Sequence, residues 1–353
     1  MEENKVLLSV QDLNVKFRVR GRILTAIRGI SLDIYRDESI AIVGESGCGK
    51  TVFTKTFAGM LDNNGFIDSG DIHFYDEGGE VNLAQVTDNK EWTKIRGRKI
   101  ATIFQDPMTS LNPIITIGKQ ITSVIMKHQN VSEAEARKKA VDLMGKVGIP
   151  NPDMRFDDYP FQYSGGMRQR IVIAIALSCQ PRILICDEPT TALDVTIQAQ
   201  ILKLIKQLQK EFGYTIVFIT HDLGVVANIA DRVAVLYAGQ IVELGKVEEI
   251  FYDPRHPYTW ALLSSLPQLA DRDTRLYSIA GTPPSLYNKI VGDAFAPRNP
   301  YCLKVDTLKE PPMFRVTDTH FARTWLLDER APKIEKPEAI RDIHGTLMKV
   351  FNI

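Results

Sequence analysis

The chain has few cysteines, no excess of charge and no long apolar run. Its four cysteines, Cys48, Cys179, Cys186 and Cys302, lack the paired short spacing of zinc and redox motifs. Lysine and arginine together number 43, as do aspartate and glutamate, so no net positive charge favours a nucleic-acid partner. No stretch reaches the roughly 18 apolar residues that a membrane-spanning helix needs, and the first residues do not resemble a secretory signal. We therefore expect a cytosolic protein without disulfides.

The apolar residues follow two kinds of pattern. Residues 6–19 and 23–34 alternate between apolar and polar, as strands with one buried face do. Uninterrupted apolar runs, which are typical of buried strands, are found at 39–43, 182–186, 215–220 and in a hairpin of 233–237 with 241–244. Strands of this kind, separated by helical segments, favour an α/β fold with a mostly parallel sheet.

The helical segments have recognisable ends. Residues 107–178 are mainly helical, and Ser132 with Glu135 forms a capping box at the start of one helix. Residues 195–212 repeat apolar side chains at helix spacing, and Gly213 follows where a helix commonly ends.

The composition changes again near residue 253. Prolines cluster from there onward, and the apolar periodicity becomes short and irregular. We therefore divide the chain into a domain of residues 1–252, with a helical subdomain at about 107–178 inserted into it, and a C-terminal extension of residues 253–353.

A glycine-rich loop lies between the apolar run 39–43 and a helical segment. Its sequence, GESGCGKT, fits the phosphate-loop pattern in full and consists of Gly44, Glu45, Ser46, Gly47, Cys48, Gly49, Lys50 and Thr51. In such a loop backbone N–H groups cradle phosphates, the lysine reaches the β- and γ-phosphates, and the threonine hydroxyl joins the coordination of Mg²⁺. We predict that the loop binds a nucleotide together with Mg²⁺.

The cysteine of this loop has two interpretations. Cys48 lies beside Lys50 and near a helix N-terminus, and both features should lower the pKa of its thiol. The alternative is that Cys48 is a small filler residue.

Polar residues follow three of the apolar strands. Asp187 and Glu188 come directly after one of them, so that Asp187 would bind Mg²⁺ and Glu188 would polarise the water that attacks the γ-phosphate. Gln105 and His221 follow two others and would sense the γ-phosphate and complete the shell around metal and water. Taken singly, each is an ordinary polar residue at a strand end. Because the carboxyl ends of parallel strands meet at one edge of a sheet, we expect all four beside the phosphate loop.

A second glycine pair opens a helix in the sequence YSGGM, residues 163–167. Ser164, Gly165 and Gly166 would leave backbone N–H groups accessible at a helix N-terminus, which stabilises an anion. The alternative is an ordinary turn before a helix.

Together these motifs resemble the nucleotide-binding subunit of an ABC transporter. The resemblance rests on GESGCGKT, Gln105, YSGGM, ILICDE, Ala192-Leu193-Asp194 and His221, in that order along the chain. It implies a P-loop NTPase fold of ABC type, with a mostly parallel core sheet, an N-terminal antiparallel β subdomain, an inserted helical subdomain and a C-terminal extension.

The same resemblance assigns roles to individual residues. Ser164, Gly165 and Gly166 would be the signature motif, and Asp194 would belong to the loop that connects two active sites. Phe17 is the candidate for the aromatic residue that stacks on adenine. Its alternative role is that of a strand residue that faces inward.

Further segments are similar to the D-type ATPase of oligopeptide and dipeptide importers, namely QDPMTSLNP, YSGGMRQRIVIAIAL, HPYTWALLSSLP and GTPPSL. This similarity implies ATP hydrolysis that drives peptide import, an F-type ATPase as heterodimer partner, two permease subunits and an extracellular solute-binding protein. It also implies a peripheral position at the cytoplasmic face of the cell membrane. Dipeptides, nickel or another small solute stay open as cargo. More distant alternatives are a soluble ABC ATPase that acts on nucleic acid or protein assembly, and a subunit that binds nucleotide without hydrolysing it.

The chain departs from these importers in one respect. Many relatives carry a C-x-F-x-P-R-C-P cysteine pattern that holds an iron–sulfur cluster, but here Asp293 and Asn299 occupy the two cysteine positions. Cys302 alone remains nearby, and one thiolate cannot replace four-cysteine ligation. We therefore predict no iron–sulfur cluster.

Overall fold

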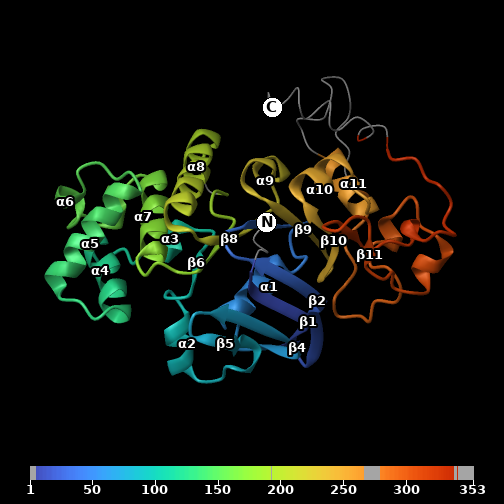
Figure 1. Cartoon of the computed structure of the whole chain (residues 1–353), viewed down its shortest axis with the longest axis horizontal. Coiled ribbons are helices and arrows are strands. Elements are labelled where there is room, and N and C mark those ends of the chain that lie inside the picture. The colour runs from blue at the N-terminus through green and yellow to red at the C-terminus, as the bar shows by residue number, and fades with distance from the viewer. Residues whose placement is uncertain (1–4, 192, 266–278, 338–339, 341–353) are drawn as a thin grey trace.

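Two β-sheets form the frame of the protein in a computed structural model of the chain (Figure 1). The structure describes residues 5–191, 193–265, 279–337 and 340. One sheet has four strands in the order β2-β1-β4-β5, and the other has eight in the order β11-β12-β10-β9-β3-β8-β7-β6. The strands are β1 Val6–Val19, β2 Arg22–Tyr35, β3 Ser39–Val43, β4 Gly65–Asp76, β5 Gly79–Asn82, β6 Ile100–Ile103, β7 Ile183–Asp187, β8 Thr215–Thr220, β9 Arg232–Tyr237, β10 Gln240–Lys246, β11 Phe314–Arg315 and β12 Phe321–Ala322.

The smaller sheet is antiparallel, and most of the larger one is parallel. Strands β9, β3, β8, β7 and β6 run in the same direction, whereas β10, β12 and β11 join antiparallel to their neighbours. Both features of the expected fold class are therefore confirmed.

The larger sheet is buried on both faces. Ala41 and Val43 of β3 pack into one hydrophobic cluster, whereas Ile40 and Ile42 of the same strand pack into a second. The first cluster contains helices on one face of the sheet, and the second contains the inner side chains of the β1-β2-β4 sheet on the other. Burial on both faces explains why these strands appear in the sequence as uninterrupted apolar runs.

Eleven α-helices lie within the described residues. They are α1 Lys50–Phe57, α2 Asn89–Ile95, α3 Pro107–Ser110, α4 Ile117–His128, α5 Glu133–Lys146, α6 Pro152–Arg155, α7 Gly165–Leu177, α8 Val195–Phe212, α9 Leu223–Ile229, α10 Val247–Tyr252 and α11 Pro257–Ser264. Helices α3 to α7 occupy the expected helical segment, and the capping box of Ser132 and Glu135 is present at the start of α5. Helix α8 ends at Gly213, which has a left-handed φ of 67°.

One helix was not expected from the sequence. Apart from the segment after the glycine-rich loop, the sequence predicts no helix before residue 107, but α2 forms there behind Asp88, whose side chain accepts a hydrogen bond from the Lys90 backbone N–H. Its apolar face consists only of Trp92 and Ile95, which is too little to give a helical period in the sequence.

The helical subdomain and the C-terminal extension lie at opposite ends of the larger sheet. Figure 1 shows helices α4 to α7 beyond β6, and the extension beside β10. Its described residues, 253–265, 279–337 and 340, form loops and short elements, and two of these elements, β11 and β12, extend the sheet past β10. No helix in the described part of the chain is long and apolar enough to cross a membrane.

Candidate nucleotide-binding and catalytic site

The glycine-rich loop follows the central strand β3 and leads directly into α1. Gly44, at the end of β3, has φ of 150°, and a Cβ atom there would lie 2.1 Å from the backbone oxygen of Leu236. Only glycine fits this position without moving β9. The buried Lys50 side chain turns back over the loop, and its Nζ donates to the backbone oxygens of Gly44 at 2.7 Å and Glu45 at 3.1 Å.

Two predicted Mg²⁺ ligands, Thr51 and Asp187, meet beside this lysine. The Thr51 hydroxyl donates to Oδ1 of Asp187, at the end of β7, over 3.1 Å. Burial raises the pKa of the Asp187 carboxyl, and the hydrogen bond from Thr51 opposes that rise. Among the described residues Asp187 forms no ion pair. A buried carboxylate next to a hydroxyl, without a paired cation, is a donor set of the kind that Mg²⁺ uses.

Glu188 is the centre of a polar cluster made of predicted catalytic residues. Its Oε2 accepts a hydrogen bond from Gln105 Nε2 at 3.2 Å and from Thr191 Oγ1 at 3.0 Å, and its Oε1 lies 3.2 Å from Nδ1 of His221. The Glu188 backbone N–H donates to the Ile219 oxygen of β8 at 2.9 Å. The φ angle of Glu188 is 46°, in the left-handed region. Gln105 follows β6 and His221 follows β8, so the sheet brings these residues together at the expected edge.

Thr191 is the member of this cluster that the sequence did not reveal. It is separated from Glu188 by a proline and a threonine, and no spacing rule distinguishes its hydroxyl from that of Thr190. Only the folded turn, in which the Thr191 backbone N–H donates to the Glu188 oxygen, directs its side chain to the carboxylate.

The second glycine pair occupies the N-terminus of α7. The Ser164 hydroxyl accepts from the Met167 backbone N–H at 3.3 Å, and a Cβ on Gly166 would lie 2.8 Å from Cγ2 of Ile197 in α8. Asp194 caps α8 by accepting from the Ile197 N–H at 3.0 Å. Ala192, quoted in the same motif, lies outside the described residues.

The signature residues and the phosphate loop belong to different clusters. In the described part of the chain, no hydrogen bond or ion pair joins Ser164, Gly165 or Gly166 to Lys50 or Glu188. The side chains nearest to Gly165 and Gly166 are instead those of Leu193 and Ile197.

Phe17 lies on β1, opposite Gly65 of β4. Its ring occupies the space above that glycine, where a Cβ would come within 2.6 Å of a ring carbon, and it packs at the margin of a hydrophobic cluster. This placement is compatible with the inward-facing role, and stacking on adenine stays a prediction.

The predicted lowering of the Cys48 thiol pKa was wrong. Burial raises the pKa of its thiol, and this effect outweighs the lowering by Lys50. The side chain is 6% exposed and lies beneath the loop, where a Cβ on Gly44 would come within 2.9 Å of its sulfur. Cys48 is thus the small filler residue of the alternative interpretation.

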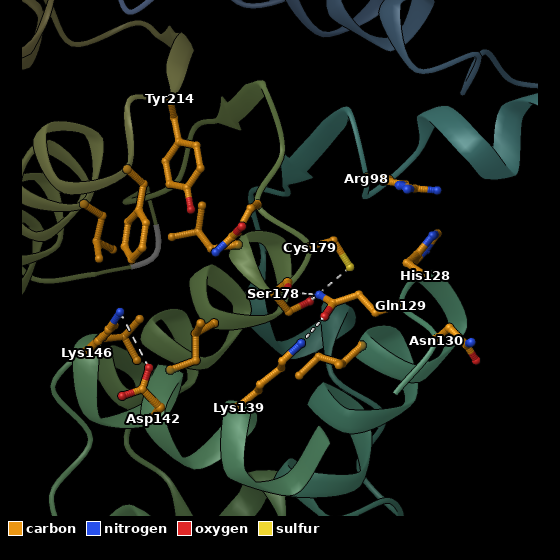
Figure 2. Close-up of a pocket in the computed structure, with 17 residues that line it drawn as sticks. Arg98, His128, Gln129, Asn130, Lys139, Asp142, Lys146, Ser178, Cys179 and Tyr214 are labelled. Atoms are coloured by element: carbon orange, nitrogen blue, oxygen red, sulfur yellow. Dashed lines mark hydrogen bonds and ion pairs between the residues drawn. The ribbon is translucent and has the colours of Figure 1, made fainter. Parts of the chain in front are cut away.

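A separate cavity of about 520 Å³ lies between α4 and α5 on one side and the ends of α7 and α8 on the other. It contains none of the predicted site residues. In Figure 2, Gln129 lies between the Ser178 backbone oxygen and Lys139, and Lys146 points to Asp142. Protein groups already pair with these two lysines, and we assign no ligand to the cavity.

Comparison with known proteins places this site in a family. Residues 27–191 match the family model described as ABC transporter, and residues 242–305 match that described as oligopeptide/dipeptide transporter, C-terminal region. The oligopeptide transport ATP-binding protein AmiE of Streptococcus pneumoniae is 62% identical over 98% of this chain and 96% of its own length. The chain belongs to the ABC transporter ATP-binding proteins of oligopeptide and dipeptide transport. Its resemblance to D-type subunits is confirmed by OppD of Bacillus subtilis, 54% identical over 98% of this chain and 96% of OppD.

Solved structures agree with this assignment. The ABC ATP-binding protein described here matches a dimeric, post-hydrolysis structure of the cassette MJ0796 bound to ADP and Pi, with a TM-score of 0.59, 28% identity and coverage of 68% of this chain and 98% of that one. It also matches cbiO1 from Clostridium perfringens, part of the transporter complex cbiONQ, with a TM-score of 0.59, 29% identity and coverage of 70% and 91%.

The segment that carries an iron–sulfur cluster in many relatives is held here by polar side chains. Asp293 Oδ1 accepts from the Phe295 N–H at 2.9 Å, and Asn299 Oδ1 accepts from the Tyr301 N–H at 2.9 Å. Both side chains are buried, whereas Cys302 is exposed. Each of the two positions forms a local turn of its own, and the absence of a cluster stays a prediction.

Proposed function

We propose that this protein is the ATP-hydrolysing subunit that energises peptide import by a multi-subunit ABC transporter. The observation that carries the proposal is the Glu188 carboxylate, held by Gln105, Thr191 and His221 at the strand edge next to the phosphate loop. Family membership and relatives named for oligopeptide and dipeptide transport support the coupling to peptides.

Glu188 is the proposed general base. Its carboxylate takes a proton from a water molecule whose oxygen attacks the γ-phosphorus, while the bond from that phosphorus to the β–γ bridging oxygen breaks and ADP leaves. The hydrogen bonds from Gln105 and Thr191 fix the carboxylate in one orientation. The His221 imidazole, on the other oxygen, is the proposed contact to the γ-phosphate.

Thr51 and Asp187 are the proposed ligands of Mg²⁺, with Gln105 at the margin of its shell. When bound, the ion would supply positive charge that offsets the negative charge of the β- and γ-phosphate oxygens. Lys50 is the proposed partner of the same oxygens, and it would exchange its present acceptors, the backbone oxygens of Gly44 and Glu45, for them.

A complete site needs a second ATPase subunit. Among the described residues no hydrogen bond joins Ser164, Gly165 or Gly166 to this chain's own phosphate loop, so we propose that they face the nucleotide held by an F-type partner, with Asp194 in the connecting loop. The dimeric state of the MJ0796 cassette supports this arrangement. Two permease subunits and an extracellular solute-binding protein complete the proposed complex, which places this chain peripherally on the cytoplasmic face of the cell membrane.

Replacement of the proposed base is the most direct test. In the complete transporter, Glu188→Gln should lower the ATPase kcat at least about 100-fold, the usual contribution of a general base, while ATP affinity changes less than about threefold. The matched control is Glu329→Gln, which removes an exposed carboxylate in the extension and should leave both values unchanged. Near-normal turnover in the Glu188 variant would refute its assignment as the base. Loss of peptide uptake in vesicles, in parallel with loss of turnover, would connect hydrolysis to transport.

A further inference from the structure

The C-terminal extension reaches the phosphate loop through one arginine. Arg298, in the short 3-10 helix Ala296–Arg298, pairs with Glu45 in a bidentate contact, with Nη1 2.6 Å from Oε2 and Nη2 3.0 Å from Oε1. Glu45 is the second residue of the loop and is separated from Arg298 by 253 positions in the chain.

Other hydrogen bonds also hold the Arg298 guanidinium in place. Its Nε donates to the Ala280 backbone oxygen at 2.9 Å, and Nη1 also lies 3.3 Å from the hydroxyl of Tyr237. The side chain is only 4% exposed, and hydrogen bonding to Glu45 raises the pKa of the guanidinium, so its charge is permanent.

A second contact from beyond residue 252 holds the backbone of the same loop residue. The Glu45 N–H donates to the hydroxyl of Tyr258 in α11 at 2.8 Å. The Tyr258 ring packs against Tyr237 and Phe295, with centroids 4.5 and 5.4 Å away. The carboxylate and the backbone N–H of Glu45 thus have their partners in the extension, whereas its backbone oxygen pairs with Lys50 inside the loop.

An acidic residue in a phosphate-binding loop carries an electrostatic cost. A nucleotide brings several negative charges to the loop, and a free carboxylate within it would repel them. The bidentate arginine neutralises this carboxylate and holds it on the side of the loop that faces the extension.

We propose that Arg298 is a positioning residue for nucleotide binding, through which the C-terminal extension sets the affinity of the phosphate loop. The inference rests on the proposed function, because it takes the loop to bind ATP. The Glu45 carboxylate would then connect the loop to the extension, and would not itself contact the phosphates.

A merely structural role for the pair predicts a different pattern of variants. If Arg298 only braces the extension, its removal should lower the melting temperature but leave the nucleotide affinity of the folded protein unchanged. If Arg298 instead shields the nucleotide from the Glu45 charge, removal of that charge should repair the loss. The effect should also weaken with salt, because a solvated carboxylate is screened.

The test measures binding of a fluorescent ATP analogue to the full-length chain, with thermal melting of each variant alongside. We expect Arg298→Ala to weaken binding of the analogue about tenfold, in keeping with the loss of a charge-assisted pair. At high salt this loss of affinity should be smaller. When Arg298→Ala is combined with Glu45→Gln, the affinity for the analogue should return to within about threefold of that of the parent protein. Arg330→Ala is the matched control, because Arg330 pairs with Asp328 elsewhere in the extension and should leave binding unchanged.

Two further variants cover the case in which Arg298→Ala does not fold. Arg298→Lys keeps the charge but loses the bidentate geometry, and should weaken binding less than Arg298→Ala. Glu45→Gln alone should bind as tightly as the parent protein or more tightly. Unchanged binding in both Arg298 variants, a double variant no better than Arg298→Ala, or weaker binding by Glu45→Gln would each overturn the proposal. A parent protein that fails to bind the analogue would instead refute the proposed function.

Discussion

Three glycine-to-alanine substitutions should have sharply different effects on stability. At Gly44 the new Cβ would lie 2.1 Å from the Leu236 backbone oxygen, and that backbone is held in register beside β3 through β9. At Gly47 the Cβ would meet nothing within 4 Å, but φ is +79°. At Gly145, in α5, there is neither a neighbour within 4 Å nor a positive φ.

The structure gives an order of magnitude for each variant. Gly44→Ala combines overpacking with an unfavourable φ and should cost about 3 kcal/mol or more of the free energy of unfolding. Gly47→Ala carries a left-handed penalty of about 1–2 kcal/mol, partly offset by the lower entropy of the unfolded chain, and should cost about 1 kcal/mol. Gly145→Ala should stabilise the protein by about 0.5–1 kcal/mol, because alanine is the better helix former.

Thermal melting of the three purified variants checks this order. At about 1.4 °C per kcal/mol for a chain of 353 residues, Gly47→Ala should melt about 1–2 °C below the parent protein, Gly44→Ala about 4 °C or more below it, and Gly145→Ala about 1 °C above it. A Gly44→Ala protein that melts within about 2 °C of the parent would show that β9 yields to the new Cβ, and would refute the reasoning. Nucleotide binding measured alongside separates a collapsed loop from an intact one.

Two predictions concern titration and thiol chemistry. Acidification from about pH 7.5 to about 5.5 should lower the free energy of unfolding through His256, since burial lowers its pKa to about 3, and raise it through Asp293, since burial raises its pKa to about 6. Each contribution is of order 1 kcal/mol of the free energy of unfolding, which urea unfolding measures at both pH values. His256→Asn should make the loss of stability on acidification smaller, and Asp293→Asn should make it larger. The reverse result would contradict the burial of these two side chains. Cys48, with its raised pKa and 6% exposure, should react with a thiol reagent more slowly than the exposed Cys302, which mass spectrometry of labelled peptides can measure. Faster labelling of Cys48 would contradict its burial.

The sequence predicted which polar residues meet at one edge of the sheet, because that edge depends on local patterns and one topological rule. An apolar run followed by a polar residue marks the end of a buried strand, and parallel strands bring such ends together, as Gln105, Glu188 and His221 show. The predicted lowering of the Cys48 thiol pKa was wrong because neighbours in the sequence reveal nearby charge but not burial. The pair of Glu45 and Arg298 could not be predicted, since no periodicity connects residues from two separate segments.

The two short strands of the extension also protect the edge of the larger sheet. Without them, β10 would present a row of unpaired backbone groups, which is a template for association with another chain. β12 pairs with β10 at Glu243 and Leu244, and the fully buried Glu243 carboxylate accepts from the Arg255 and His256 N–H groups and contacts His320. A chain shortened at residue 252 would lose all of these partners at once. It should therefore aggregate rather than yield a minimal ATPase.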